Sequence, residues 1–143
     1  MSTNSNDMEV KIRYLEMIQS VINRMASNSF LLKGWTVTIV VGLFVFANKA
    51  DNMDPKYIFL ALIPAIFFWI LDGYFLHQEK LYRELYKYAT NISSDEVDFS
   101  MNAARFGGEI DSWRKVTLST TLKLFYIPII CVIGIGIVIS FCF

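Results

Sequence analysis

The sequence predicts an all-α membrane protein with three transmembrane helices, an N-terminal amphipathic helix and cytoplasmic helical extensions. Of its 143 residues, 55% are hydrophobic and only 18% are charged, whereas a soluble domain is about 45–50% apolar and about 25% charged. The apolar residues gather in three blocks, and Lys and Arg are distributed unequally among the segments between them. These observations together indicate a membrane protein with a preferred orientation.

Each apolar block is close to the length of about 20 residues that a membrane-spanning helix needs. The blocks cover residues 30–48, 57–76 and 124–143, with one charge in the first, Lys33, and one in the second, Asp72. The third block carries no charge. A soluble core that buried all three would be larger than this chain can surround. We therefore expect three spans in a single membrane domain over residues 1–143.

The orientation of the spans follows from the basic residues that flank them, because cytoplasmic segments carry an excess of Lys and Arg. The N-terminal tail carries three basic residues and the long segment between the second and third blocks carries six, against only Lys49 and Lys56 in the short first loop. We expect the N-terminus in the cytoplasm, and the loop at residues 51–55 and the C-terminus outside. The expected location is the bacterial inner membrane.

Two polar segments are expected to be helical outside the bilayer. Residues 7–28 form the amphipathic helix, whose apolar positions recur at steps of three and four residues: Tyr14, Leu15, Ile18, Val21, Ile22 and Met25. This helix could lie on the inner membrane face, or pack on the cytoplasmic segment or on another copy. Asn28 or Ser29 is expected to cap the first span. Residues 77–117 are expected to form a cytoplasmic platform, with one helix continuing beyond the second span and another running from Glu109 into the third.

Lys33 and Asp72 are the most informative single residues. A charge in the middle of a spanning helix costs about 2.5–3.5 kcal/mol on insertion scales, and less near the ends. Lys33 lies near the start of the first span and Asp72 near the end of the second, so both lie at a similar depth on the cytoplasmic side. We predict that they form an ion pair. The alternatives are separate solvation, since the Lys33 stem can reach the interface, and a direct role in ion passage.

Small residues predict where the spans approach one another, because helix contacts in lipid favour them. The candidate helix-packing residues are Ala61, Ala65, Gly134, Gly136 and Ser140. Pro64 and Pro128 are expected to bend their helices or to free backbone carbonyls. No span carries a continuous polar stripe, so any pore would have to form between copies.

The sequence contains no pattern typical of catalysis or of cofactor binding. No metal motif, glycine-rich phosphate loop or nucleophile elbow is present, so we assign no catalytic, cofactor or metal residue and do not expect an enzyme. The net charge is zero and no basic stripe stands out, which argues against nucleic-acid binding. The expected partners are membrane lipid and further copies of the chain.

Three runs carry a resemblance: RMASNSFLLKGW (residues 24–35), FWILDGYFL (68–76) and VDFSM (97–101). The chain resembles a family of small, largely uncharacterised bacterial integral membrane proteins found in antiphage defence operons. The resemblance extends over nearly the whole chain and implies that Lys33, Asp72 and the VDFSM loop belong to a shared pattern. It supplies no catalytic residues.

Two functions are therefore expected. The first is an oligomerising membrane effector that perturbs membrane integrity or ion balance, in the setting of antiphage defence. The alternative is a passive membrane anchor or accessory subunit that recruits a soluble cytoplasmic partner through residues 78–117.

Overall fold

The structure is a computed structural model that describes residues 3–49 and 55–142, and these residues are mainly helical. Three helical stretches are long and apolar enough to cross a membrane, Asn6–Ala47, Lys56–Asn91 and Thr120–Cys142. The predicted class is confirmed at this level. The predicted external loop at residues 51–55 lies largely outside the described residues.

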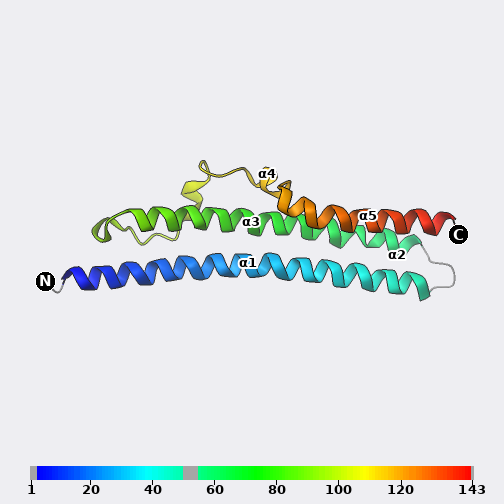
Figure 1. Cartoon of the computed structure of the whole chain (residues 1–143), viewed down its shortest axis with the longest axis horizontal. Helices are drawn as coiled ribbons and strands as arrows, with labels where there is room; N and C mark the ends of the chain where they lie inside the picture. Colours follow the sequence, from blue (N-terminus) through cyan, green and yellow to red (C-terminus); the bar gives the residue numbers. More distant parts are fainter. Residues whose placement is uncertain (1–2, 50–54, 143) are drawn as a thin grey trace.

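Helix α1 (Thr3–Lys49) runs antiparallel to α2 (Pro55–Leu60) and α3 (Leu62–Asn91), which follow one another in a nearly continuous row (Figure 1). Two 3₁₀ turns, η1 (Ser94–Glu96) and η2 (Ala103–Phe106), lead to α4 (Trp113–Thr117) and then to α5 (Thr120–Cys142), which packs on α2 and α3. Below, "polar end" means residues 3–28, 77–91 and 92–117, and "apolar end" means the remaining helical residues.

The predicted division of the N-terminal half into an amphipathic helix and a separate first span is wrong. Helix α1 continues through Asn28 and Ser29 without a break and has 47 residues, which at 1.5 Å per residue is a length of about 70 Å. No proline or glycine interrupts residues 3–33. Ser29 does not cap a helix, because its hydroxyl donates a hydrogen bond to Asp72 on α3.

The second span is interrupted at Ala61, between α2 and α3. In a continuous helix the N–H of residue 64 would donate to the carbonyl of Leu60, but residue 64 is proline and has no N–H. The Ala61 N–H donates to the Ile58 carbonyl at 3.1 Å, the spacing of a tighter turn. Beyond Asp72 the helix continues to Asn91, as predicted for the extension.

The prediction of one continuous helix from Glu109 into the third span is also wrong. Residues 109–112 are not helical, and a break at Leu118 and Ser119 separates α4 from α5. The Thr117 carbonyl, which in an uninterrupted helix would accept from residue 121, instead accepts the indole N–H of Trp69 at 2.8 Å. Tertiary contact with α3 therefore accompanies the break.

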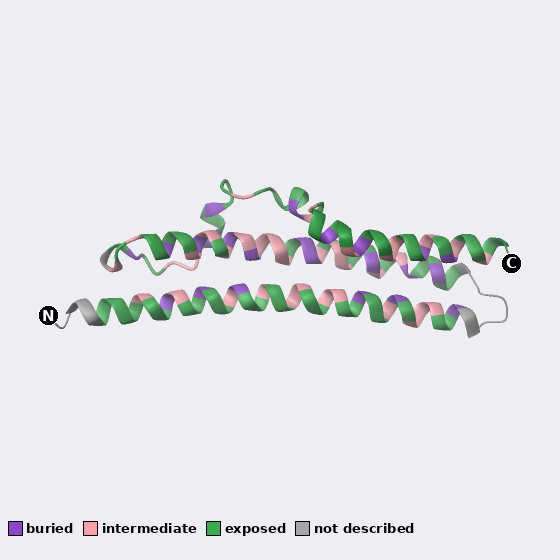
Figure 2. Ribbon diagram, in the orientation of Figure 1, coloured by how far each residue is buried: buried purple, intermediate pink, exposed green. Residues whose placement is uncertain are grey.

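Two separate apolar clusters hold the helices together. At the polar end, residues of α1 and α3 pack with the intervening loop: Tyr14, Ile18, Ile22, Leu81, Leu85, Ala89, Val97, Ala103 and Phe106. At the apolar end the cluster consists of Val40, Ala47, Ile58, Ala61, Ala65 and Ile133. Buried positions recur along the side of α1 that faces α3 (Figure 2). The predicted apolar stripe of the N-terminal segment is thus covered, at Tyr14, Ile18 and Ile22, by the same chain.

The outward faces of the apolar end carry large hydrophobic side chains. Phe30, Leu124 and Phe141 are each at least 70% exposed. Isolated exposed apolar residues are normal on soluble proteins, but large contiguous apolar surfaces mark interaction with a membrane or a partner. The distribution of exposed apolar side chains is therefore compatible with a lipid-facing surface.

Gly73 of α3 lies in close contact with Thr117, at the end of α4. A Cβ added there would clash with Thr117 Oγ1 and lie 2.8 Å from its Cβ and 3.0 Å from its Cα. We expect Gly73→Ala to lower the free energy of unfolding by about 1–3 kcal/mol through overpacking. Thermal unfolding of the purified chain measures this, with Gly134→Ala as the matched control, because nothing lies within 4 Å of a Cβ at Gly134. Equal effects of the two substitutions would contradict the packing assigned to Gly73.

Candidate functional site

The candidate site is centred on the carboxylate of Asp72, which is fully buried where α1, α3 and α5 meet. Lys33 Nζ lies 2.5 Å from Asp72 Oδ2 and forms the ion pair. Ser29 Oγ donates to Asp72 Oδ1 at 2.5 Å. The structure thus brings the two predicted partners together, and they are not separately solvated.

A third helix contributes to the same carboxylate. The Tyr126 hydroxyl, on α5, lies 3.1 Å from Asp72 Oδ2 and 3.3 Å from the Phe68 carbonyl. Its ring stacks on Trp69 with a centroid separation of 5.7 Å and an interplanar angle of 2°. Since Trp69 also donates to the Thr117 carbonyl, the network extends from α1 through α3 and α5 to the end of α4.

The geometry satisfies both charges of the ion pair. Lys33 Nζ donates a second hydrogen bond to Ser29 Oγ at 2.8 Å and lies 5.8 Å from the centroid of the Phe125 ring. Lys33 keeps 23% of its side chain exposed, whereas Asp72 has none exposed. Removing one partner of a buried pair costs about 3–5 kcal/mol, because the other charge remains buried without compensation. The network therefore fixes the relative positions of three helices.

The structure separates the candidate helix-packing residues into two groups. Ala61 and Ala65 are fully buried in the apolar-end cluster, and Gly136 is in contact, since a Cβ there would lie 2.7 Å from Phe44 Cε1. Gly134 has nothing within 4 Å of an added Cβ. The Ser140 hydroxyl donates to the Ile137 carbonyl of its own helix at 2.8 Å.

Ser29 and Tyr126 belong to the site but were not expected there from the sequence. Ser29 precedes Lys33 by four residues, which places both on one face of a helix. Tyr126 lies near the inner end of the third span, at a depth similar to that of Asp72. Spacing could have indicated Ser29, whereas the contact of Tyr126 depends on how α5 packs.

The loop that contains the VDFSM run is held by Arg105 at the polar end. Arg105 pairs with Asp98 at 2.6 Å, and its guanidinium lies 4.6 Å from the centroid of the Tyr88 ring. Phe99, within this run, has a φ of 50°, which is uncommon for a bulky residue. Tyr14 on α1 donates to the Ser100 carbonyl at 2.5 Å. The loop is therefore attached to both long helices.

The chemistry available to the Asp72 network is that of a satisfied charge pair. Among residues 3–49 and 55–142, no group of three or more His, Cys, Asp or Glu could hold a metal ion. No protein-family model, curated protein or solved structure matches this chain. The arrangement joins helices, and it places an ionisable group in the bundle where α1, α3 and α5 meet.

Exchanging the charges tests the ion pair. Lys33→Asp and Asp72→Lys should each lower the free energy of unfolding by about 3–5 kcal/mol, because each leaves two like charges facing one another. The double variant restores opposite charges, and the hydroxyls of Ser29 and Tyr126 can accept as well as donate. We expect it to recover at least half of the loss in thermal unfolding and in the yield of folded protein. A double variant no more stable than the single variants would show that the pairing does not hold the helices together.

A second prediction concerns Asp98, which lies outside the spans. The hydrogen bonds from the Arg105 side chain and the Ser100 backbone N–H hold the pKa of Asp98 below its ordinary value of 3.8. The stability that the charged Asp98 carboxylate gives to this loop is therefore present above pH 3.8. It is lost as the pH falls through the lowered pKa of Asp98. We expect Arg105→Gln to raise the pKa of Asp98 in a carboxyl titration followed by NMR. Arg24→Gln serves as the control, and a pKa of Asp98 unchanged by Arg105→Gln would contradict the assigned cause.

Proposed function

We propose that this chain is a small bacterial inner-membrane protein whose copies assemble through their spans and perturb membrane integrity or ion balance. In this proposal the N-terminus is cytoplasmic and the C-terminus lies outside, in accord with the excess of Lys and Arg in the polar end. The observation that carries the proposal is a face of α1 that the chain itself leaves unpacked.

This face consists of Gly34, Thr38 and Gly42, spaced four residues apart. Nothing lies within 4 Å of a Cβ added at either glycine. At 100° per residue, Thr38 lies about 160° around the helix from Thr36, which is fully buried against the rest of the chain. Small residues at this spacing let two helices approach closely in lipid. The α1 face therefore suits packing between copies.

The polar groups buried in the interior of one copy, among the described residues, do not form an ion path. Thr36 donates to the Leu32 carbonyl of its own helix at 2.7 Å, and Asp72 is enclosed by its partners. Further along the apolar end, the helices pack through an apolar cluster that includes Ile58 and Ile133, with Phe44 against it. An ion path would accordingly form between copies, and assembly along α1 would bring their polar ends together.

The setting we propose is antiphage defence, which rests on the resemblance carried by residues 24–35, 68–76 and 97–101. An effector of this kind would be silent until a signal acts on the polar end. Because α1 and α3 are each helical through both ends, a displacement at the polar end would be transmitted to the spans.

The alternative is a membrane anchor or accessory subunit that recruits a soluble cytoplasmic partner. One observation favours it: Phe99 is 44% exposed and holds an uncommon backbone conformation in a loop fixed by Arg105 and Tyr14. A rigidly presented aromatic side chain is typical of a binding surface.

Substitution on the α1 face separates the two functions. If copies pack through this face, Gly34→Leu and Gly42→Leu should reduce cross-linking between copies and slow depolarisation of expressing cells by about tenfold, since the interhelical contact contributes about 1–2 kcal/mol. A membrane-potential dye measures the second effect, with the operon neighbours present. Val37→Leu, at an exposed position outside the face, is the matched control. Unchanged membrane potential on expression of the unsubstituted chain would favour the anchor.

A further inference from the structure

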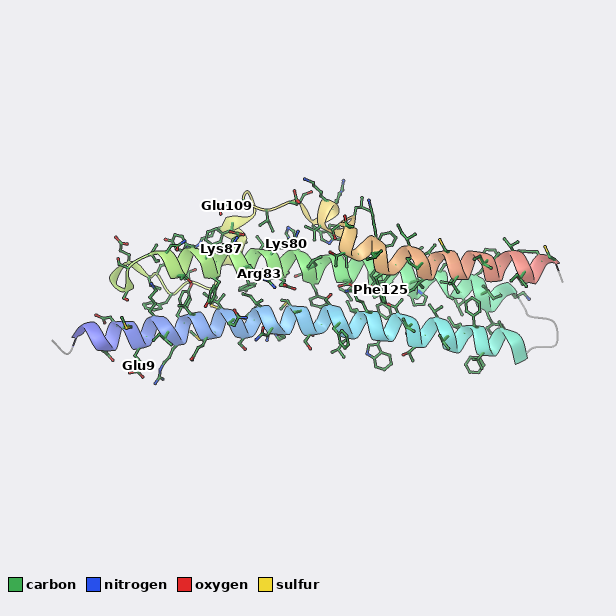
Figure 3. The ribbon with its side chains drawn as sticks, viewed as in Figure 1. Glu9, Lys80, Arg83, Lys87, Glu109 and Phe125 are labelled. Atoms are coloured by element: carbon green, nitrogen blue, oxygen red, sulfur yellow. The ribbon has the colours of Figure 1, made fainter. Side chains whose placement is uncertain are left out.

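A cavity of about 900 Å³ lies at the polar end, between α1, α3 and the loop at residues 108–111. Helix α3 contributes Lys80, Arg83 and Lys87 to its lining, and the loop contributes Glu109 and Asp111. Figure 3 shows the three basic residues along α3 and Glu109 on the loop that passes over this helix. Glu84 of α3 also lines the cavity, so the α3 side carries three basic residues and one acidic residue, and the loop side carries two acidic residues.

Internal ion pairs already engage most of these charges. Arg83 pairs with Glu79 at 2.7 Å, Lys87 with Glu84 at 2.6 Å, and Asp111 with Lys115 at 2.6 Å. Within the described part of the chain, Lys80 and Glu109 line the cavity without an ion pair within 4.0 Å. The cavity therefore offers one cation and one anion to a ligand.

The side of the cavity on α1 adds neutral polar groups. Gln19 Nε2 donates to Asn23 Oδ1 at 3.2 Å, so that the Gln19 oxygen and the Asn23 amide N–H groups are available to a ligand. Ala26 also lines the cavity. Ser29, which donates to Asp72, follows Ala26 by about 4.5 Å along the helix axis. The cavity ends within one helical turn of the buried charge network.

The depth of the cavity points to the lipid headgroup layer, given the orientation proposed above. Lys80 follows Leu76, the last residue of the predicted second span, by four residues, or about 6 Å at helical rise. The polar layer of a bilayer is about 5–8 Å thick on each side. Lys80 therefore lies where phospholipid headgroups lie, and basic pockets between helices on the cytoplasmic side are known to take such groups.

We propose that this cavity binds a phosphoethanolamine group, with the phosphate at Lys80 and the ammonium at Glu109. A purely anionic group would leave Glu109 and Asp111 facing a like charge, whereas a zwitterion satisfies both sides of the cavity. The group can belong to a membrane phospholipid or to a free ester such as glycerophosphoethanolamine. The membrane source rests on the proposed function, because it requires the polar end to border the bilayer.

The experiment uses the full chain, delipidated and reconstituted in nanodiscs, with bound lipid measured by native mass spectrometry. Phosphatidylethanolamine, phosphatidylglycerol and phosphatidylcholine are compared at equal acyl composition. We expect the first to be retained at least about tenfold better than the others, because only it has both a phosphate and N–H donors. Lys80→Gln and Glu109→Gln should each reduce this retention about tenfold.

Two matched controls change a charge away from the cavity. Glu9→Gln alters an exposed residue of α1 that pairs with Arg13 (Figure 3), and Lys123→Gln alters an exposed residue at the start of α5. Both should bind as the unsubstituted chain does. Equal retention of phosphatidylglycerol, or retention unchanged by Glu109→Gln, would overturn the proposal, because a simple anion site would then account for binding.

A second arm identifies the source. Free glycerophosphoethanolamine is titrated against the chain in detergent without lipid. Binding that is weakened by both Lys80→Gln and Glu109→Gln supports the same site for a soluble ester. Selective retention of phosphatidylethanolamine in nanodiscs, without binding of the free ester in detergent, supports the membrane source. Failure of both arms would overturn the site while leaving cross-linking through the α1 face unaffected, so the two proposals fail separately.

Discussion

A carboxylate without solvent contact can remain charged in an apolar bundle only where donors surround it, since burying an unpaired charge costs several kcal/mol. Asp72 meets this condition through an ammonium and two hydroxyls, supplied by α1 and α5. These groups can reach it only if the three helices keep one relative depth and rotation. The register of the whole bundle therefore depends on this one carboxylate, and the closeness of α4 to Gly73 and Trp69 follows from the same placement.

The continuity of the long helices links the two ends of the molecule. Helix α1 contributes to both apolar clusters, and α3 does so as well. At its far end α3 is held by Lys11 of α1, whose ammonium donates to the Ile92 carbonyl at 2.5 Å, where the end of a helix carries partial negative charge. The antiparallel helices α1 and α3 are therefore held together near both ends and at Asp72.

Two surfaces remain unused by the contacts within one chain. The Gly34, Thr38 and Gly42 face lies at the apolar end, and the cavity beside Lys80 lies at the polar end. We propose a second copy of α1 as the partner of the first surface, and a phosphoethanolamine group as the ligand of the second. The two surfaces lie on opposite sides of the Asp72 network, so occupancy of the cavity and association through α1 would act on the same helices.

Local sequence features determined the three apolar stretches, because hydrophobic length is a property of consecutive residues. The pairing of Lys33 with Asp72 also followed from the sequence, since two single charges at equal depth in apolar helices have few other partners. Sequence could not show that Ser29 would turn to Asp72 instead of capping a helix, or that the Trp69 indole would bind the Thr117 carbonyl where the helix breaks. Those outcomes depend on which groups meet across helices. Tertiary packing alone decided these contacts of Ser29 and Trp69. It also decided the role of Tyr126 and the cavity at Lys80. All of these features need side chains from separate segments at hydrogen-bonding or van der Waals distance.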